Sequence, residues 1–157
     1  MHNTASVTTQ IALKHYATEV CSHSHDFVQL VLPITGIFEL EIGYQVGRVN
    51  ANTAAYIPAG ETHCFAGSQD NLFVVEDLPD HSNLMTDCNP AIFSELSSAA
   101  IKFLQFAGDY LPQTTHVAAT DSFQSLLLNL VLPSMTERLD PVVKGVKQWI
   151  NVIYQPP

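Results

Sequence analysis

Basic residues are scarce in this chain. Its 157 residues include 6 Lys plus Arg against 15 Asp plus Glu, which gives a formal net charge of −9. Affinity for nucleic acid comes largely from lysines and arginines that displace counterions from the phosphate backbone. An acidic surface repels that backbone. We therefore expect these residues by themselves not to bind DNA.

Cysteine is also rare. Cys21, Cys64 and Cys88 form an odd set with no Cys-x-x-Cys pair. A chain of this length buries a core without disulfides or a structural metal, which only smaller scaffolds usually need. The first residues lack the cationic stretch and apolar segment of a secretion signal. The sequence thus predicts reduced cysteines and a cytoplasmic location.

Long hydrophobic runs are missing as well. The most apolar stretch, residues 126–132, is interrupted by Asn129. It is far shorter than the roughly 20 residues that a bilayer crossing needs. We therefore expect no membrane span.

What the front half does contain is a series of short runs rich in β-branched and aromatic residues. Turn residues separate these runs, a pattern typical of a small barrel or sandwich. In the second run Phe38, Leu40 and Ile42 share one face, while Glu39 and Glu41 share the other. The predicted strands are 27–32, 37–42, 44–49, 54–57, 62–66 and 72–78.

After a loop at 79–90 the hydrophobic period becomes helical. Apolar residues recur at three- and four-residue steps from Phe93 to Ala107. Residues 120–122 form a plausible N-cap for a second helix from Phe123, which Pro133 should end or kink. Asp140 and Pro141 predict the start of a third helix. The fold class is therefore β-rich α+β, a β-barrel followed by carboxy-terminal helices.

Histidines carry the chemistry of the front half. In an extended strand, residues two apart point the same way, so His23, His25 and Gln29 would project from one face. His63 follows a turn farther along the chain. Three imidazoles and an amide oxygen inside a barrel would suit zinc, nickel or iron. All four ligands are neutral, so we expect weaker metal affinity than a carboxylate would give.

The same residues carry a resemblance to cupins. His23, His25, Gln29 and Gly36 match the first cupin motif, and Pro58, Gly60 and His63 match the second. Gln29 stands where metal-binding cupins usually have glutamate. The resemblance implies a cupin-like β-barrel with a site for a divalent metal.

The resemblance narrows to the amino-terminal sensor domain of AraC-type transcription regulators. Residues 23–33, 54–58 and 71–75 are similar to that domain, and residues 139–150 look like the first helix of the family's DNA-binding domain. The resemblance implies a ligand-sensing barrel at 1–85 and linker and dimerisation helices at 86–139. Residues 140–157 would begin a helix-turn-helix DNA-binding domain that is truncated here.

The leading hypothesis is therefore a sensor in which a small-molecule effector enters the barrel and controls the absent DNA-binding domain. Strand parity suggests the residues of the effector-binding wall. They are His23, His25, Phe27, Gln29, Phe38, Leu40 and His63.

The alternative is a metal-dependent cupin enzyme, a dioxygenase or isomerase. This hypothesis needs a carboxylate that faces the barrel interior as acid or base. Only Glu61 and Glu76 are plausible candidates in the sequence.

The helices suggest a homodimer. The run at 126–132 is apolar on nearly every side, and this is more apolar surface than one intramolecular contact would cover. We therefore expect two copies of the chain to associate through these helices.

Overall fold

The computed structural model describes residues 10–18, 21–79, 90–114 and 117–135. Both predicted domain boundaries, at residues 85 and 139, and the predicted third helix lie outside the described residues. The elements, in chain order, are β1 (Gln10–Lys14), β2 (Cys21–His23), β3 (Phe27–Thr35), β4 (Phe38–Ile42), β5 (Gln45–Val49), β6 (Thr53–Ile57), β7 (His63–Gly67), β8 (Leu72–Pro79), β9 (Phe93–Glu95), α1 (Ser98–Tyr110), η1 (Leu111–Gln113) and α2 (Val117–Met135).

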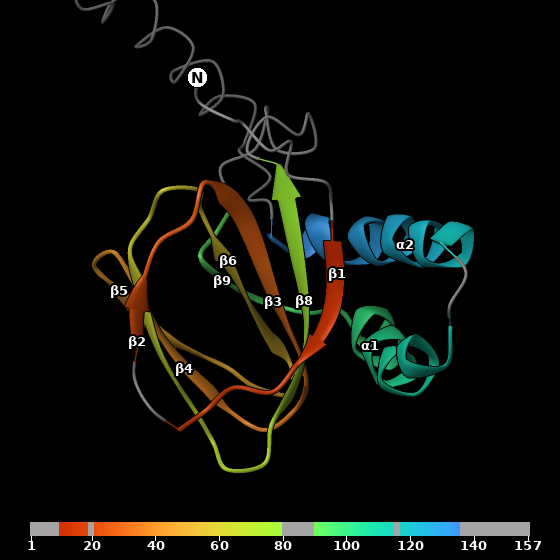
Figure 1. The fold of residues 1–157 in the computed structure, drawn as a ribbon, viewed down its shortest axis with the longest axis horizontal. Coiled ribbons are helices and arrows are strands. Elements are labelled where there is room, and N and C mark those ends of the chain that lie inside the picture. Colours follow the sequence, from red (N-terminus) through yellow and green to blue (C-terminus); the bar gives the residue numbers. More distant parts are fainter. Residues whose placement is uncertain (1–9, 19–20, 80–89, 115–116, 136–157) are drawn as a thin grey trace, which may run out of the picture.

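Two antiparallel sheets face each other, and helices α1 and α2 lie outside one of them (Figure 1). Sheet A has the strand order β1-β8-β3-β6-β9, and sheet B has the order β2-β7-β4-β5. This architecture confirms the predicted fold class and all six predicted strands. Because β1, β2 and β9 are short and have little alternation, the sequence did not reveal them.

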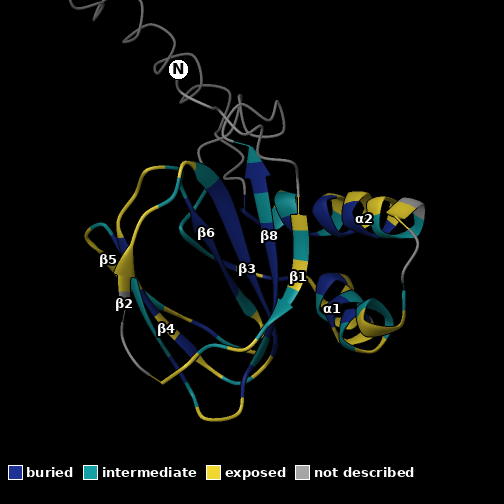
Figure 2. Ribbon diagram, in the orientation of Figure 1, coloured by how far each residue is buried: buried dark blue, intermediate teal, exposed yellow. Residues whose placement is uncertain are grey.

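The two sheets are buried differently. One face of sheet B is exposed to solvent. In β4, for example, Phe38, Leu40 and Ile42 are buried while Glu39 and Glu41 are exposed. Strands β3 and β8 of sheet A are buried along most of their length, because one face lines the barrel and the other contacts the helices (Figure 2). Near-continuous burial explains why their hydrophobic runs do not alternate.

Residues 93–95 differ from the prediction. They form β9, which pairs with β6, and they are not the start of a helix. The Phe93 ring lies over Gly47, where a Cβ would come within 2.5 Å of the ring. Helix α1 begins later, and Ser97 caps it by accepting a hydrogen bond from the Ala100 amide at 3.2 Å.

Helix α2 also differs from the prediction. It begins at Val117, so residues 120–122 lie inside the helix and are not its cap. Pro133 is tolerated within the last turn. Proline has no N–H to donate to the carbonyl four residues earlier, which here is the carbonyl of Asn129. Asn129 and Pro133 are both exposed, so water can donate a hydrogen bond to that carbonyl.

The apolar run of α2 is mostly covered within the chain. Leu127, Leu128 and Val131 are buried in the cluster between sheet A and the helices. Leu126, with 49% of its surface exposed, is the clear exception. The expectation that one intramolecular contact would leave this run uncovered is therefore wrong for most of its apolar residues.

Asn71 fastens the segment after β1 to the barrel. Its side chain accepts a hydrogen bond from the Tyr16 amide at 2.8 Å and donates to the Tyr16 carbonyl at 2.9 Å. Gly36, with φ of +84°, lets this loop pack closely, since a Cβ there would lie 2.5 Å from the Asp70 carbonyl. The fastening holds the Tyr16 ring against Phe38 inside the barrel.

Glu76 is fully buried on the helix-facing side of sheet A. Its neighbours along β8, Val74 and Leu78, belong to the helix-packed cluster. Neither carboxylate oxygen has a well-formed hydrogen bond among the described residues. Burial raises the pKa of Glu76 to about 8; Gln124 of α2 opposes the rise and the charge of Asp77 adds to it.

We predict that Glu76→Gln removes a pH-dependent loss of stability. Between the ordinary pKa of 4.5 and about 8, folded Glu76 keeps a proton that the unfolded chain releases, so stability falls as pH rises through this window. Between pH 5.5 and pH 8 the wild type should lose on the order of 3 kcal/mol of stability that the variant keeps, at about 1.4 kcal/mol per pKa unit. Urea unfolding at pH 5.5 and 8 measures the difference.

The matched control is Glu41→Gln, because Glu41 is exposed on sheet B. It should keep the wild-type pH dependence. Equal pH dependence in wild type and Glu76→Gln would show that this carboxyl is not protonated in the folded state.

Candidate functional site

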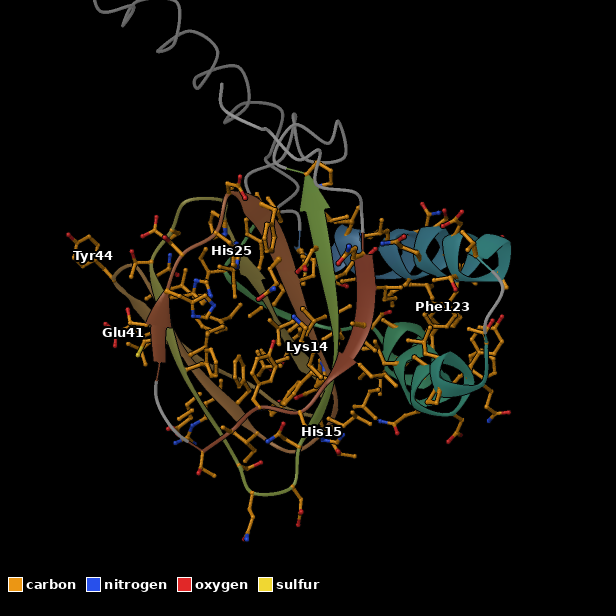
Figure 3. The ribbon with its side chains drawn as sticks, viewed as in Figure 1. Lys14, His15, His25, Glu41, Tyr44 and Phe123 are labelled. Atoms are coloured by element: carbon orange, nitrogen blue, oxygen red, sulfur yellow. The ribbon has the colours of Figure 1, made fainter. Side chains whose placement is uncertain are left out.

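Three histidines converge at the rim of the barrel. His23 ends β2 and lies opposite His63, the first residue of β7, while His25 follows in the link to β3. The Nε2 atoms of His23 and His63 are 3.0 Å apart. One ligand nitrogen from each of the three rings lies within 4.8 Å of the others. Figure 3 shows His25 between the two sheets.

Backbone carbonyls orient two of these rings. The Nδ1–H of His25 donates to the Phe27 carbonyl at 2.7 Å, and the Nδ1–H of His63 donates to the Glu61 carbonyl at 3.1 Å. Each Nε2 is then left with a lone pair. The Nε2 of His25 is buried and has no hydrogen-bond partner among the described residues. Metal-binding histidines are usually held in this way, so the three imidazoles fit a divalent ion.

A backbone hydrogen bond also joins the two cupin-like motifs. The Gly60 amide donates to the His25 carbonyl at 2.7 Å. Gly60 has a φ of +77°, in the left-handed region that favours glycine. This turn therefore places both His25 and the start of β7, where His63 stands.

The surroundings favour the neutral form of His63 and hold the ring of His25 in place. His63 is buried, and this burial lowers its pKa, with a further lowering from His23 and His25. The Phe27 ring is stacked on His25 with centroids 4.1 Å apart and planes 4° from parallel. A neutral imidazole is the form that binds metal.

Gln29 is buried in the same interior. Its Nε2 donates to the Asp77 carboxylate at 2.7 Å. The amide oxygen is then the part of Gln29 available to a metal or an effector. Its assignment as fourth metal ligand stays a prediction.

A cavity of about 130 Å³ lies beside the histidines. Four predicted wall residues line it, namely His23, Gln29, Phe38 and His63. Three others do not: Phe27 and His25 stack on each other at the rim, and Leu40 is packed into the interior core. The sequence reasoning missed Lys14, Tyr16, Ile57 and Phe65.

The missed residues differ in how far the sequence could reveal them. In the predicted strands, Phe65 and Ile57 are an even number of residues away from positions that face the interior. The alternation of side chains along a strand could therefore have identified both. Lys14 belongs to β1 and Tyr16 to the segment after it, and neither segment was predicted. No signal in the sequence marked these two.

The carboxylates expected for an enzyme do not line the cavity. Glu76 faces the helices, and exposed Glu61 lines a surface hollow beside Glu41 and Cys64. The carboxylate on the interior face is Asp77, which parity reasoning did not single out and which bonds Gln29. The described lining residues of the cavity include no acid.

No helix among the described residues is long and apolar enough to span a membrane. Comparison with protein-family models finds no match, and comparison with curated proteins finds none either.

Solved structures do match the fold. The chain is similar to CuxR, an AraC-like transcriptional activator, with a TM-score of 0.59 and 12% identity over 92% of this chain and 60% of CuxR. It is also similar to a variant of ToxT from Vibrio cholerae, with a TM-score of 0.52 and 9% identity over 93% of this chain and 65% of ToxT. The chain thus spans under two thirds of either protein, and its cupin-like fold is the fold of the matched part.

We predict that the chain binds one zinc ion at His23, His25 and His63. His63→Gln should weaken zinc binding at least tenfold, because it removes one of three nitrogen ligands. Competition with a chromophoric chelator measures the affinity. Binding should also weaken as pH falls below 6.5, the ordinary histidine pKa, because protons compete for the ligands.

His15→Gln is the matched control, because His15 lies outside the cluster. It should bind zinc like wild type. The site is refuted if His63→Gln and wild type hold zinc equally well.

We further predict that Gln29→Glu tightens zinc binding at least tenfold and lowers the melting temperature of the metal-free protein. The new carboxylate would supply a negative ligand, but without metal it would face Asp77 at the 2.7 Å contact. Chelator competition and thermal unfolding measure the two effects. Gln45→Glu adds the same charge at an exposed position and should change neither; an equal gain there would contradict a local effect.

Proposed function

We propose that this chain is the effector-sensing part of an AraC-type transcription regulator. The observation that carries the proposal is the match in fold along 92% of the chain to an AraC-like activator, helices included. DNA binding would then belong to another domain of the intact protein, in keeping with the net charge of −9 here. The effector would bind in the cavity beside the histidines.

Strands β3 and β8 give such a sensor a short route from effector to helices. Gln29 and Asp77 face the barrel interior, while their neighbours Leu30 and Glu76 face the helices. A ligand that shifts an interior residue of either strand would therefore also shift the adjacent residue, which faces α1 and α2. The effector would act by binding one arrangement of the helices better than the other.

A zinc, nickel or iron ion held by His23, His25 and His63 would form part of the effector site. Bound there, the ion would supply a Lewis-acidic position for an oxygen or nitrogen atom of the effector. The residues of the chain fix the imidazoles through the Phe27 and Glu61 carbonyls. A cupin enzyme is supported less well, because the described cavity lining offers no acid or base of the carboxylate type.

The helices would also hold a homodimer. Phe106 of α1 and Leu126 of α2 are each about half exposed, at 50% and 49%. They flank Phe123: the Phe106 ring lies 6.4 Å from it, and Leu126 is one helical turn farther on. These residues give the helix pair an exposed apolar patch that a second copy could cover.

We predict that Leu126→Glu converts a dimer into a monomer by placing a charge in this patch. Sedimentation at high micromolar concentration measures the mass. Val46→Glu is the control, since Val46 is 76% exposed on sheet B, away from the helices, and should leave the dimer intact. A wild-type monomer at these concentrations would refute the dimer.

A reporter experiment tests the function itself. The chain is fused to a foreign DNA-binding domain that occupies its operator only as a dimer. Wild type should repress the reporter, and Leu126→Glu should not. Failure of an abundant, folded wild-type fusion to repress would refute a dimerising regulatory domain.

A further inference from the structure

A second hollow lies along the open edge of sheet A. Strand β1 is the last strand of this sheet, beside the helices (Figure 1), and among the described residues it pairs with β8 alone. The hollow has a volume of about 400 Å³ and lies between β1 and residues 117–124 of α2. We call it the edge groove. Of its lining residues only Lys14 also lines the cavity beside the histidines, so the two hollows are separate sites.

The walls of the edge groove are a strand edge and one side of a helix. Every residue of β1 except Leu13 contributes to the first wall. The residues of α2 in the second wall recur at steps of three and four, which places them on one side of the helix. They are Val117, Thr120, Asp121 and Gln124. The groove therefore runs along the strand, with the helix opposite.

The edge of β1 is open to pairing with another strand. Prolines, bulges and charged side chains commonly protect such edges. β1 contains no proline, its register with β8 is regular from Gln10 to Lys14, and its one charged residue is the last. In an edge strand, alternate residues direct their N–H and C=O groups away from the sheet. An extended chain in the edge groove could bond these groups.

The edge groove also reaches both faces of the sheet. Ile11 packs toward the helix-side cluster, whereas Asp77, the cross-strand partner of Gln10, bonds Gln29 on the interior side. A strand placed beside β1 would direct alternate side chains toward these two faces. The five residues of β1 would give it about 17 Å of edge, at about 3.4 Å per residue. The shape of the groove thus suits an extended peptide.

The charges of the edge groove favour a basic ligand. Two carboxylates, those of Asp77 and Asp121, line it together with the single ammonium of Lys14. The ion pair within the described residues joins Arg48 to Glu39, so neither carboxylate has a basic partner there. Lys14 pairs with Phe73, at the end of β1 opposite Asp77. One end of the groove is therefore negative.

Two further side chains of α2 in this groove lack a partner. Val117 is apolar and 75% exposed. Gln124 is buried, and its amide nitrogen has no hydrogen-bond partner in the part of the chain that the structure describes. A buried donor left in this way is destabilising. A main-chain carbonyl of a bound peptide would give the Gln124 amide a partner once the amide turned toward it.

We propose that the edge groove binds an extended, basic peptide segment of another protein, which adds a strand beside β1. Main-chain hydrogen bonds to β1 hold the segment, the carboxylates bind its lysine or arginine side chains, and Val117 contacts an apolar one. PDZ and PTB domains bind peptides by the same addition to a sheet edge. The proposal goes beyond the sensor function, because it assigns a partner to a surface outside the histidine cavity and the dimer patch.

Two peptides of opposite charge test the proposal on the full chain. One is an eight-residue peptide of alternating lysine and valine, with blocked ends and a fluorescent label, and the other has glutamate in place of lysine. Fluorescence anisotropy measures both affinities. The lysine peptide should bind at least tenfold more tightly than the glutamate peptide. Equal affinities, or no binding of the lysine peptide, would overturn the proposal.

A third peptide separates strand addition from attraction between charges. Alternating lysine and proline keep the charge, but proline has no N–H and disfavours a paired strand. This peptide should bind at least tenfold more weakly than the lysine and valine peptide. The latter should also slow hydrogen exchange of the β1 amides. Equal binding of the two peptides, or unchanged exchange in β1, would refute an added strand.

Asp121→Lys places the binding in the edge groove. It should weaken binding of the lysine and valine peptide at least fivefold, because it reverses a charge of the groove. Asp109→Lys is the matched control, since Asp109 is exposed on α1 outside the groove and changes the net charge equally. Equal affinities of the two folded variants would overturn the assignment. Neither result depends on whether the reporter fusion represses.

Discussion

Burial of β3 and β8 on both faces is the constraint on which the rest of the structure depends. One face of each strand lines the barrel interior, and the other face belongs to the cluster packed against the helices. Polar residues in them must therefore find partners inside the protein or stay uncharged. Gln29 and Asp77 satisfy each other on the interior face, while Glu76, one residue away, is kept protonated to a high pH beneath α2.

The histidine cluster depends on backbone geometry more than on side-chain packing. The Gly60 turn bonds the His25 carbonyl, and carbonyls of Phe27 and Glu61 orient the imidazoles of His25 and His63. These contacts come from turns and strand ends, so the backbone itself brings the three rings together. The three nitrogen ligands are neutral, so the site has no negative ligand of its own to balance the charge of a divalent ion.

Much of the barrel was predictable because its strands alternate or are continuously apolar. The β4 pattern from Phe38 to Ile42 follows from the two-residue period of a strand. The histidine cluster does not, because His23 ends β2, His25 lies in the link to β3 and the expected single strand face is not formed. Periodicity failed at Phe93, where a short strand on a barrel edge has too few residues to show a period. It failed again at the start of α2, because the helix begins at Val117 and includes the residues expected to cap it.

The sequence by itself determined the barrel, the two histidine motifs and the acidity, because each depends on local spacing or on composition alone. Only the tertiary structure decided that Asp77 faces the interior and Glu76 faces the helices, since a one-residue change of parity exchanges the two faces of a strand. It alone placed Lys14 beside the histidines. That contact joins β1 to β7, which are far apart in the chain, and no local pattern records such a contact.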